Sequence, residues 1–95
     1  MTLESLEPRF VMIDGAGWRP VDTLGEAQGI ECTCPSCRSH PLLAWFRGRG
    51  VPDGLEPGPG RWTLSGTGYG DLTLAPSINV RCWHGFVRGG RVTNA

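Results

Sequence analysis

Four cysteines and two histidines are the residues of this chain best suited to bind a metal, and three of the cysteines lie close together. Cys32, Cys34 and Cys37 follow the pattern C-x-C-x2-C, and Pro35 and Ser36 between them suit a tight turn. Thiolates at this spacing can converge on one ion, and Zn²⁺ suits soft thiolates and tetrahedral coordination. The cluster therefore predicts a zinc site.

A structural zinc site needs a fourth ligand, and the sequence offers two. His40 would complete a wholly local site, whereas Cys82 would tie the C-terminal hairpin to the cluster and account for every cysteine. A small domain gains more from the second arrangement, because the metal then replaces missing core. We therefore expect Cys32, Cys34, Cys37 and Cys82 as ligands of a structural Zn²⁺. A set in which His40 replaces Cys32 remains open.

Ser77, His84 and Asp71 are the candidate catalytic residues. Ser77 follows Pro76 and precedes His84 by seven residues, so two neighbouring strands could bring the side chains together. A nucleophilic serine needs a base within hydrogen-bond reach and donors for an oxyanion. Backbone N–H groups near Gly85 or after Ser77 could be those donors, and Asp71 or a backbone carbonyl could orient the histidine. By themselves these features are weak evidence, because a single histidine in a hairpin is more often structural.

The length and composition predict one small, mostly β domain. The chain has 95 residues, of which 15 are glycine and 8 are proline, and this content disfavours long helices. We expect a single zinc-stabilised domain over residues 1–95: a small antiparallel sheet whose zinc knuckle ties the N-terminal half to the C-terminal hairpin. Trp45, Trp62 and Trp83 are expected to form core or to shield the metal.

Short apolar or alternating stretches bounded by turn residues predict the strands. They are FVMI, HPLLAWF, RWTLSG, DLTLAPSINV and the hairpin CWHGFVRGGRVT, whose arms join through Gly89 and Gly90. Leu72 and Leu74 should share one face of their strand. Residues 18–29 predict a loop, and the Gly/Pro-rich residues 47–60 predict a longer one.

Charge and hydropathy limit the partners and the compartment. The formal net charge is zero, and all nine basic residues are arginine, so there is no electrostatic case for nucleic acid. The start MTLESLEPRF lacks an apolar core of signal-peptide length, and no run reaches the length of a membrane span. We expect a cytoplasmic protein with a protein partner. In a reducing compartment, clustered cysteines more often bind metal than form disulfides.

The stretches CPSCRSH, TLAPSI and CWHGF, the last continuing into FVRGGRV, together resemble a family of small phage and bacterial proteins long known only as a domain of unknown function. Members combine a cysteine knuckle, a tryptophan before the middle strand, a T-L-x-P-S-I motif and a Cys/His segment that ends in a hairpin. The similarity covers roughly residues 30 to 93. Some relatives lie beside bacterial ubiquitin-like conjugation genes and are regarded as serine peptidases of the BubE type.

The resemblance implies a zinc-stabilised serine peptidase with Ser77 as nucleophile and His84 as its base. Its substrate would be a protein tail such as a ubiquitin-like C-terminus, which is extended and could add beside an exposed strand. A phage-encoded member would act in the host cytoplasm. The alternative is a non-catalytic zinc-binding interaction module, such as a phage accessory or inhibitor protein, with a surface such as the Arg47–Arg49 loop. A catalytic metal assisted by His84 is disfavoured, because four cysteines would close the site.

Overall fold

Strands dominate the computed structural model, which describes residues 1–58, 60–80 and 83–95. The strands are β1 (Arg9–Asp14), β2 (Gly17–Val21), β3 (Gly29–Thr33), β4 (Pro41–Trp45), β5 (Thr63–Ser65), β6 (Thr73–Val80), β7 (Trp83–Arg88) and β8 (Arg91–Asn94). Two 3-10 turns, η1 (Leu3–Leu6) and η2 (Leu24–Glu26), are the helical elements of the described residues. The predicted mostly β fold is confirmed.

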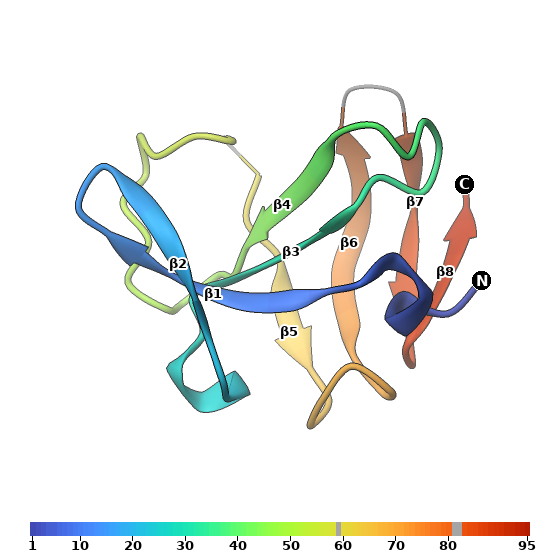
Figure 1. The fold of residues 1–95 in the computed structure, drawn as a ribbon, viewed down its shortest axis with the longest axis horizontal. Helices are drawn as coiled ribbons and strands as arrows, with labels where there is room; N and C mark the ends of the chain where they lie inside the picture. The colour runs from blue at the N-terminus through green and yellow to red at the C-terminus, as the bar shows by residue number, and fades with distance from the viewer. Residues whose placement is uncertain (59, 81–82) are drawn as a thin grey trace.

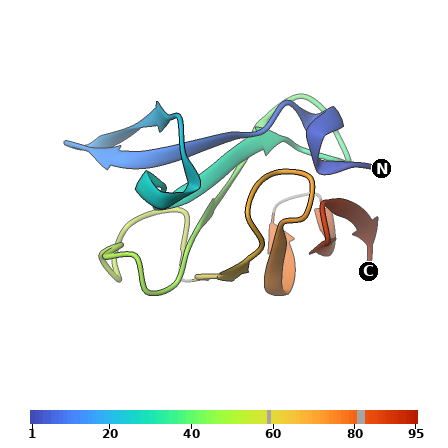
Figure 2. The same ribbon diagram turned by 90° about the horizontal axis from the view of Figure 1, so that it is seen from below.

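Two four-stranded antiparallel sheets form the fold, with strand orders β2-β1-β3-β4 and β5-β6-β7-β8. The two views show them as two layers, with β1, β2 and β3 in one layer and β5 to β8 in the other (Figures 1 and 2). The hairpin of β7 and β8 turns at Gly89 (φ 56°) and Gly90 (φ 77°). Positive φ at both loop residues suits a two-residue hairpin and requires glycine, so the predicted hairpin is confirmed in the described residues.

The core lies between the sheets and is largely aromatic and aliphatic. Trp62 and Trp83 belong to this core and are 8 and 5 % exposed, whereas Trp45, 0 % exposed, lies in a separate buried cluster with Val11 and Leu43. All three are buried, as the sequence predicted. Leu72 and Leu74 are also buried, which confirms their shared face. Alternating residues of β6 and β7 therefore face away from the core, and Ser77 and His84 lie among them.

A short crossing connects the two sheets. Phe46, directly after β4, forms a parallel bridge with Trp62, directly before β5. The Trp62 N–H donates to the Trp45 carbonyl (3.0 Å), and the Arg47 N–H donates to the Trp62 carbonyl (2.7 Å). The edge of β4 and the start of β5 are therefore joined at this one place, and the described part of the 47–60 loop, which contains no strand, bulges out between them.

The loop predicted over residues 18–29 is wrong in its first part, because β2 covers Gly17–Val21. Pro20 argued against a strand there, but β2 is the edge of its sheet, where a missing N–H costs no ladder bond. The Trp18 ring meets the Trp45 ring edge-on, with centroids 6.0 Å apart. This contact holds the β1–β2 hairpin against the rest of the sheet.

Candidate functional site

Ser77 and His84 lie on neighbouring strands and on the same face of their sheet. In the register of β6 and β7, Asn79 is opposite His84 and Val80 is opposite Trp83. Side chains of directly opposite residues share a face, and Ser77 shares the face of Asn79 because it lies two residues away. The His84 Nε2 atom is 3.4 Å from the Ser77 Oγ atom, at the solvent surface. The structure thus brings together the two predicted catalytic side chains.

A register shift in β6 helps to place Ser77. Leu74 pairs with Val87, whereas Ile78 pairs with Gly85, so β6 advances by four residues over a stretch in which β7 advances by two. Such a bulge re-aims side chains and is common beside active sites. Ile78 remains 1 % exposed in the core, which anchors the strand directly beyond Ser77.

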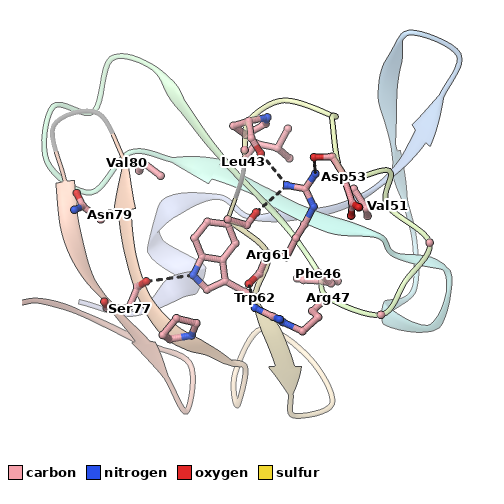
Figure 3. A pocket seen from close by; sticks show the side chains of 16 residues that line it. Leu43, Phe46, Arg47, Val51, Asp53, Arg61, Trp62, Ser77, Asn79 and Val80 are labelled. Atoms are coloured by element: carbon pink, nitrogen blue, oxygen red, sulfur yellow. Dashed lines mark hydrogen bonds between the residues drawn. The ribbon is translucent and has the colours of Figure 1, made fainter.

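Ser77 also lines a cleft of about 790 Å³. Its walls come from β4 and the residues after it, from the described part of the 47–60 loop, and from the second half of β6 (Figure 3). The indole Nε1 of Trp62 donates to the Ser77 carbonyl across 3.3 Å, so the tryptophan that precedes β5 fixes the serine backbone. The serine therefore lies at the junction of the outer sheet face and the cleft.

Arg61 organises the loop wall of this cleft. Its guanidinium donates to backbone carbonyls of Pro52 and Leu55 at 2.8 and 3.0 Å, and to the Gly60 carbonyl at 2.8 Å. Longer bonds reach two more carbonyls, those of Pro57 and Asp53 (Figure 3). A loop without strands is thus tied together by one side chain that presents a planar fork of donors.

Asp71 lies in the turn before β6 and is engaged there. Its carboxylate accepts from the backbone N–H groups of Thr67 and Gly68 at 2.9 Å and from the Thr67 hydroxyl at 3.0 Å. The Thr67 N–H and then the Gly68 N–H lower the pKa of Asp71. Among the residues that the structure describes, no carboxylate is hydrogen-bonded to His84. The serine and histidine therefore stand as a pair, and Asp71 as their third member stays a prediction.

The predicted cysteine turn brings Cys34, Cys37 and His40 together. One ligand atom from each residue lies within 4.8 Å of the others, so the group could hold a metal ion. The turn is closed by the Cys34 N–H, which donates to the His40 carbonyl (3.1 Å), and by Arg38 at φ 59°, whose N–H donates to the Cys34 carbonyl (3.1 Å). The His40 Nδ1 atom is 2.8 Å from the Cys37 Sγ atom.

The chemistry of these donors fits a metal. The Nε2 atom of His40 is buried, and no hydrogen-bond partner for it exists within the described part of the chain. Such an orphaned nitrogen is costly unless something binds it, and two thiols with one imidazole form a common donor set for zinc. Cys82, the fourth ligand predicted from the sequence, lies outside the described residues.

Cys32 lies apart from this group, in β3, where it is 7 % exposed. Burial, and to a smaller extent the neighbouring Cys34 and Glu31, raise the pKa of the Cys32 thiol to about 12. Glu31 itself is 8 % exposed and accepts hydrogen bonds from Arg9 (2.6 Å) and from the Trp18 indole (3.3 Å). The ligand role of Cys32 stays a prediction, while its side chain packs in the apolar core.

Comparison with known proteins gives no relative: no family model, no curated protein and no solved structure matches the chain. The family resemblance therefore stays a prediction. In the described part of the chain, no helix has the length and apolar character that crossing a membrane requires. Three features of the structure therefore bear on function: the Ser77–His84 pair, the cleft beside it and the turn that holds Cys34, Cys37 and His40.

Sequence reasoning missed three residues that shape this site. Arg61 is the first residue of the predicted strand RWTLSG, and its five carbonyl acceptors cannot be inferred from the sequence. Glu31 was not considered, although an acid between two apolar stretches is a signal for a buried ion pair. Asn79 could have been found, because it lies two residues after Ser77 and must share its face in a strand.

Proposed function

We propose that the protein is a serine peptidase that acts on an extended protein tail, with Ser77 as nucleophile and His84 as general base. The observation that carries the proposal is the 3.4 Å separation of the Ser77 Oγ and His84 Nε2 atoms beside an open cleft. Separations in this range are expected before a substrate tightens the contact.

The proposed reaction follows the usual order of covalent hydrolysis. The Ser77 oxygen attacks the scissile carbonyl while His84 Nε2 takes the hydroxyl proton, and His84 then gives that proton to the leaving amine. Water, deprotonated by His84, attacks the resulting ester, and His84 returns that proton to the Ser77 oxygen as it leaves. The Ser77 backbone N–H is a candidate donor for the oxyanion, because the neighbouring Ser77 carbonyl is already held toward the cleft by Trp62.

A fluorophosphonate probe tests this proposal without a known substrate. Attack of an activated serine on the phosphorus expels fluoride and leaves one stable phosphonate, which intact-protein mass spectrometry detects as a single added mass. We expect labelling of the unaltered protein at Ser77, no labelling of Ser77→Ala, and labelling at least about a hundred-fold slower in His84→Gln.

Ser65→Ala is the matched control, since Ser65 is exposed on β5 of the same sheet and should leave labelling unchanged. Absence of labelling in the folded, unaltered protein, or equal labelling of His84→Gln, would remove the peptidase from consideration. A non-catalytic interaction module would then be the better account of the fold.

The second part of the proposal concerns the metal. We propose that Cys34, Cys37 and His40 bind a structural Zn²⁺ and that Cys82 completes the site. The support is the convergence of the three side chains in one turn, together with the buried, unpartnered His40 nitrogen. This set differs from the expectation drawn from spacing by placing His40 where Cys32 was expected.

Zinc content measured by native mass spectrometry decides between the ligand sets. We expect one zinc per chain, and its loss in Cys34→Ser, His40→Gln and Cys82→Ser but not in Cys32→Ser. Loss in Cys32→Ser with retention in His40→Gln would restore the four-cysteine set. A folded protein that never takes up zinc would end this part of the proposal, and the peptidase test would be unaffected.

A further inference from the structure

We propose that the cleft beside Ser77 is a slot for one extended peptide strand, which pairs with the open edge of β6 at Asn79 and continues past Ser77. The occupant rests on the proposed function, since the strand would be the tail of the substrate protein. The slot itself rests on the register of the sheets, which leaves backbone hydrogen-bonding groups exposed along the cleft.

The second half of β6 has a strand on one side only. β5 pairs with β6 from Ser65↔Thr73 to Thr63↔Ala75 and ends there. β6 continues to Val80, and over this second half β7 is its partner on the opposite side. Within the described residues, the edge from Pro76 to Val80 therefore faces the cleft rather than a strand.

The direction of the backbone groups follows from the ladder. The His84 carbonyl accepts from the Ala95 N–H (2.9 Å), so the polar groups of His84 point toward β8 and away from β6. In an antiparallel pair, the residue opposite such a residue also points its N–H and C=O outward. Asn79, opposite His84, therefore directs both groups into the cleft. Ser77 points the same way, as its bond from Trp62 shows.

The other wall of the cleft is also a strand edge. β4 is the last strand of its sheet, and the Trp45 carbonyl on its outer side accepts from the Trp62 N–H. Leu43, two residues earlier, points its backbone groups in the same direction and lines the cleft (Figure 3). Beyond the crossing at Trp62, the edges of β4 and β6 thus both border the open space.

These two edges determine the chemical class of the ligand. An extended peptide offers alternating donors and acceptors that satisfy an unpaired strand edge, whereas a helix has already used its own. An apolar small molecule would bury the Asn79 and Leu43 backbone groups without partners. A strand that pairs with Asn79 would continue past Ser77, where its next carbonyl meets the hydroxyl and the His84 ring.

The test uses a display library of random peptides of about ten residues, long enough for one strand. The library is selected on immobilised Ser77→Ala protein, which binds without cleaving, and the enriched peptides are labelled for fluorescence anisotropy. Asn79→Pro removes the side chain and a backbone N–H that points into the cleft, and proline is tolerated on a strand edge. Asn79→Ala keeps the N–H and controls for the lost side chain.

We expect enriched peptides whose affinity falls about ten-fold or more in Asn79→Pro and less than about two-fold in Asn79→Ala. No enrichment over the empty support, or equal affinity for the two variants, would overturn the slot. If Asn79→Pro does not fold, the pairing is tested instead by the hydrogen-exchange rate of the Asn79 backbone amide in the Ser77→Ala protein, with and without peptide. A saturating peptide should slow that exchange at least about ten-fold, and an unchanged rate would refute the pairing.

The two proposals fail separately. Because binding is measured in Ser77→Ala, it does not depend on catalysis. Peptide binding at Asn79 together with absent fluorophosphonate labelling would leave a peptide-binding module that is not an enzyme. Labelling of Ser77 without any peptide binding in the cleft would leave a hydrolase whose substrate lies on the outer face of the sheet.

Discussion

Replacing Arg61 by methionine should loosen the loop that forms one wall of the cleft. Methionine keeps most of the length and apolar stem of the side chain and removes every donor. The backbone carbonyls of Pro52, Leu55 and Gly60, which accept the three shortest bonds, would then depend on water. The rest of the fold should persist, because these carbonyls belong to no strand.

The cost can be worked from the contacts. Each of the three bonds of 3.0 Å or less is worth about 1 kcal/mol net in a half-exposed place, and the two longer ones add little. The Nε atom of Arg61 is buried without a partner among the described residues, and relieving it returns about 1 kcal/mol. A net loss of about 2 kcal/mol remains, which for a domain of this size lowers the melting temperature by about 10 °C.

Thermal unfolding followed by circular dichroism measures this loss, with Arg61→Lys as the matched variant. Lysine keeps the charge but is a single point donor, so it should recover only about half of the lost stability. An Arg61→Met protein that melts within about 2 °C of the unaltered protein would refute the reasoning. The five carbonyl contacts would then add nothing to the stability of the loop.

Three further outcomes are expected. Gly85→Ala should cost about 3 kcal/mol or more in chemical denaturation, because a Cβ there would overlap a β8 carbonyl and the Trp83 ring; a wild-type midpoint would contradict the packing. The bonds to Asp71 lower its pKa, so its carboxylate stabilises the fold above the unfolded-state pKa of about 3.9, and this contribution fades as the pH falls through the lower folded-state pKa. In Asp71→Asn, the melting temperature should therefore change less steeply with pH below about pH 4 than in the unaltered protein. An unchanged slope would contradict the stabilising role of the Asp71 carboxylate. Trp62→Phe should lose about 1 kcal/mol and slow labelling of Ser77, since the backbone bond to the serine is gone; unchanged labelling would show that this bond does not position the nucleophile.

Local signals in the sequence were sufficient for much of the fold. Gly89 and Gly90 between two alternating stretches define a two-residue hairpin, because both need the positive φ that glycine accepts. Leu72 and Leu74 are both buried, as predicted, because side chains two residues apart in an extended chain point to the same face. Pro20 misled, because its cost depends on whether a strand lies at an edge, and only the complete sheet decides that.

The candidate site was harder to predict, because its geometry depends on register and strand length. Spacing alone allowed Ser77 and His84 to meet, but a shift of one residue would have put them on opposite faces. The cleft exists because the pairing of β5 with β6 stops at Thr63, the first residue of β5, while β6 runs on to Val80, which no local pattern predicts. Cys32 fits the cysteine spacing, but it lies within β3, and the turn that holds the other two cysteines begins only after Thr33.

The order in which the chain can fold follows from how η1 is anchored. The Leu3 N–H donates to the Gly90 carbonyl (2.9 Å) and the Met1 carbonyl accepts from the Val92 N–H (2.8 Å), so the first residues pair with the final hairpin. The sheet of β1 to β4 needs only the first half of the chain and can form while synthesis continues. The first residues must wait for almost the whole chain, and such distant pairings slow folding. During translation, the buried side of that first sheet therefore remains uncovered until the second sheet emerges, and this exposed apolar face makes the half-made chain prone to aggregate.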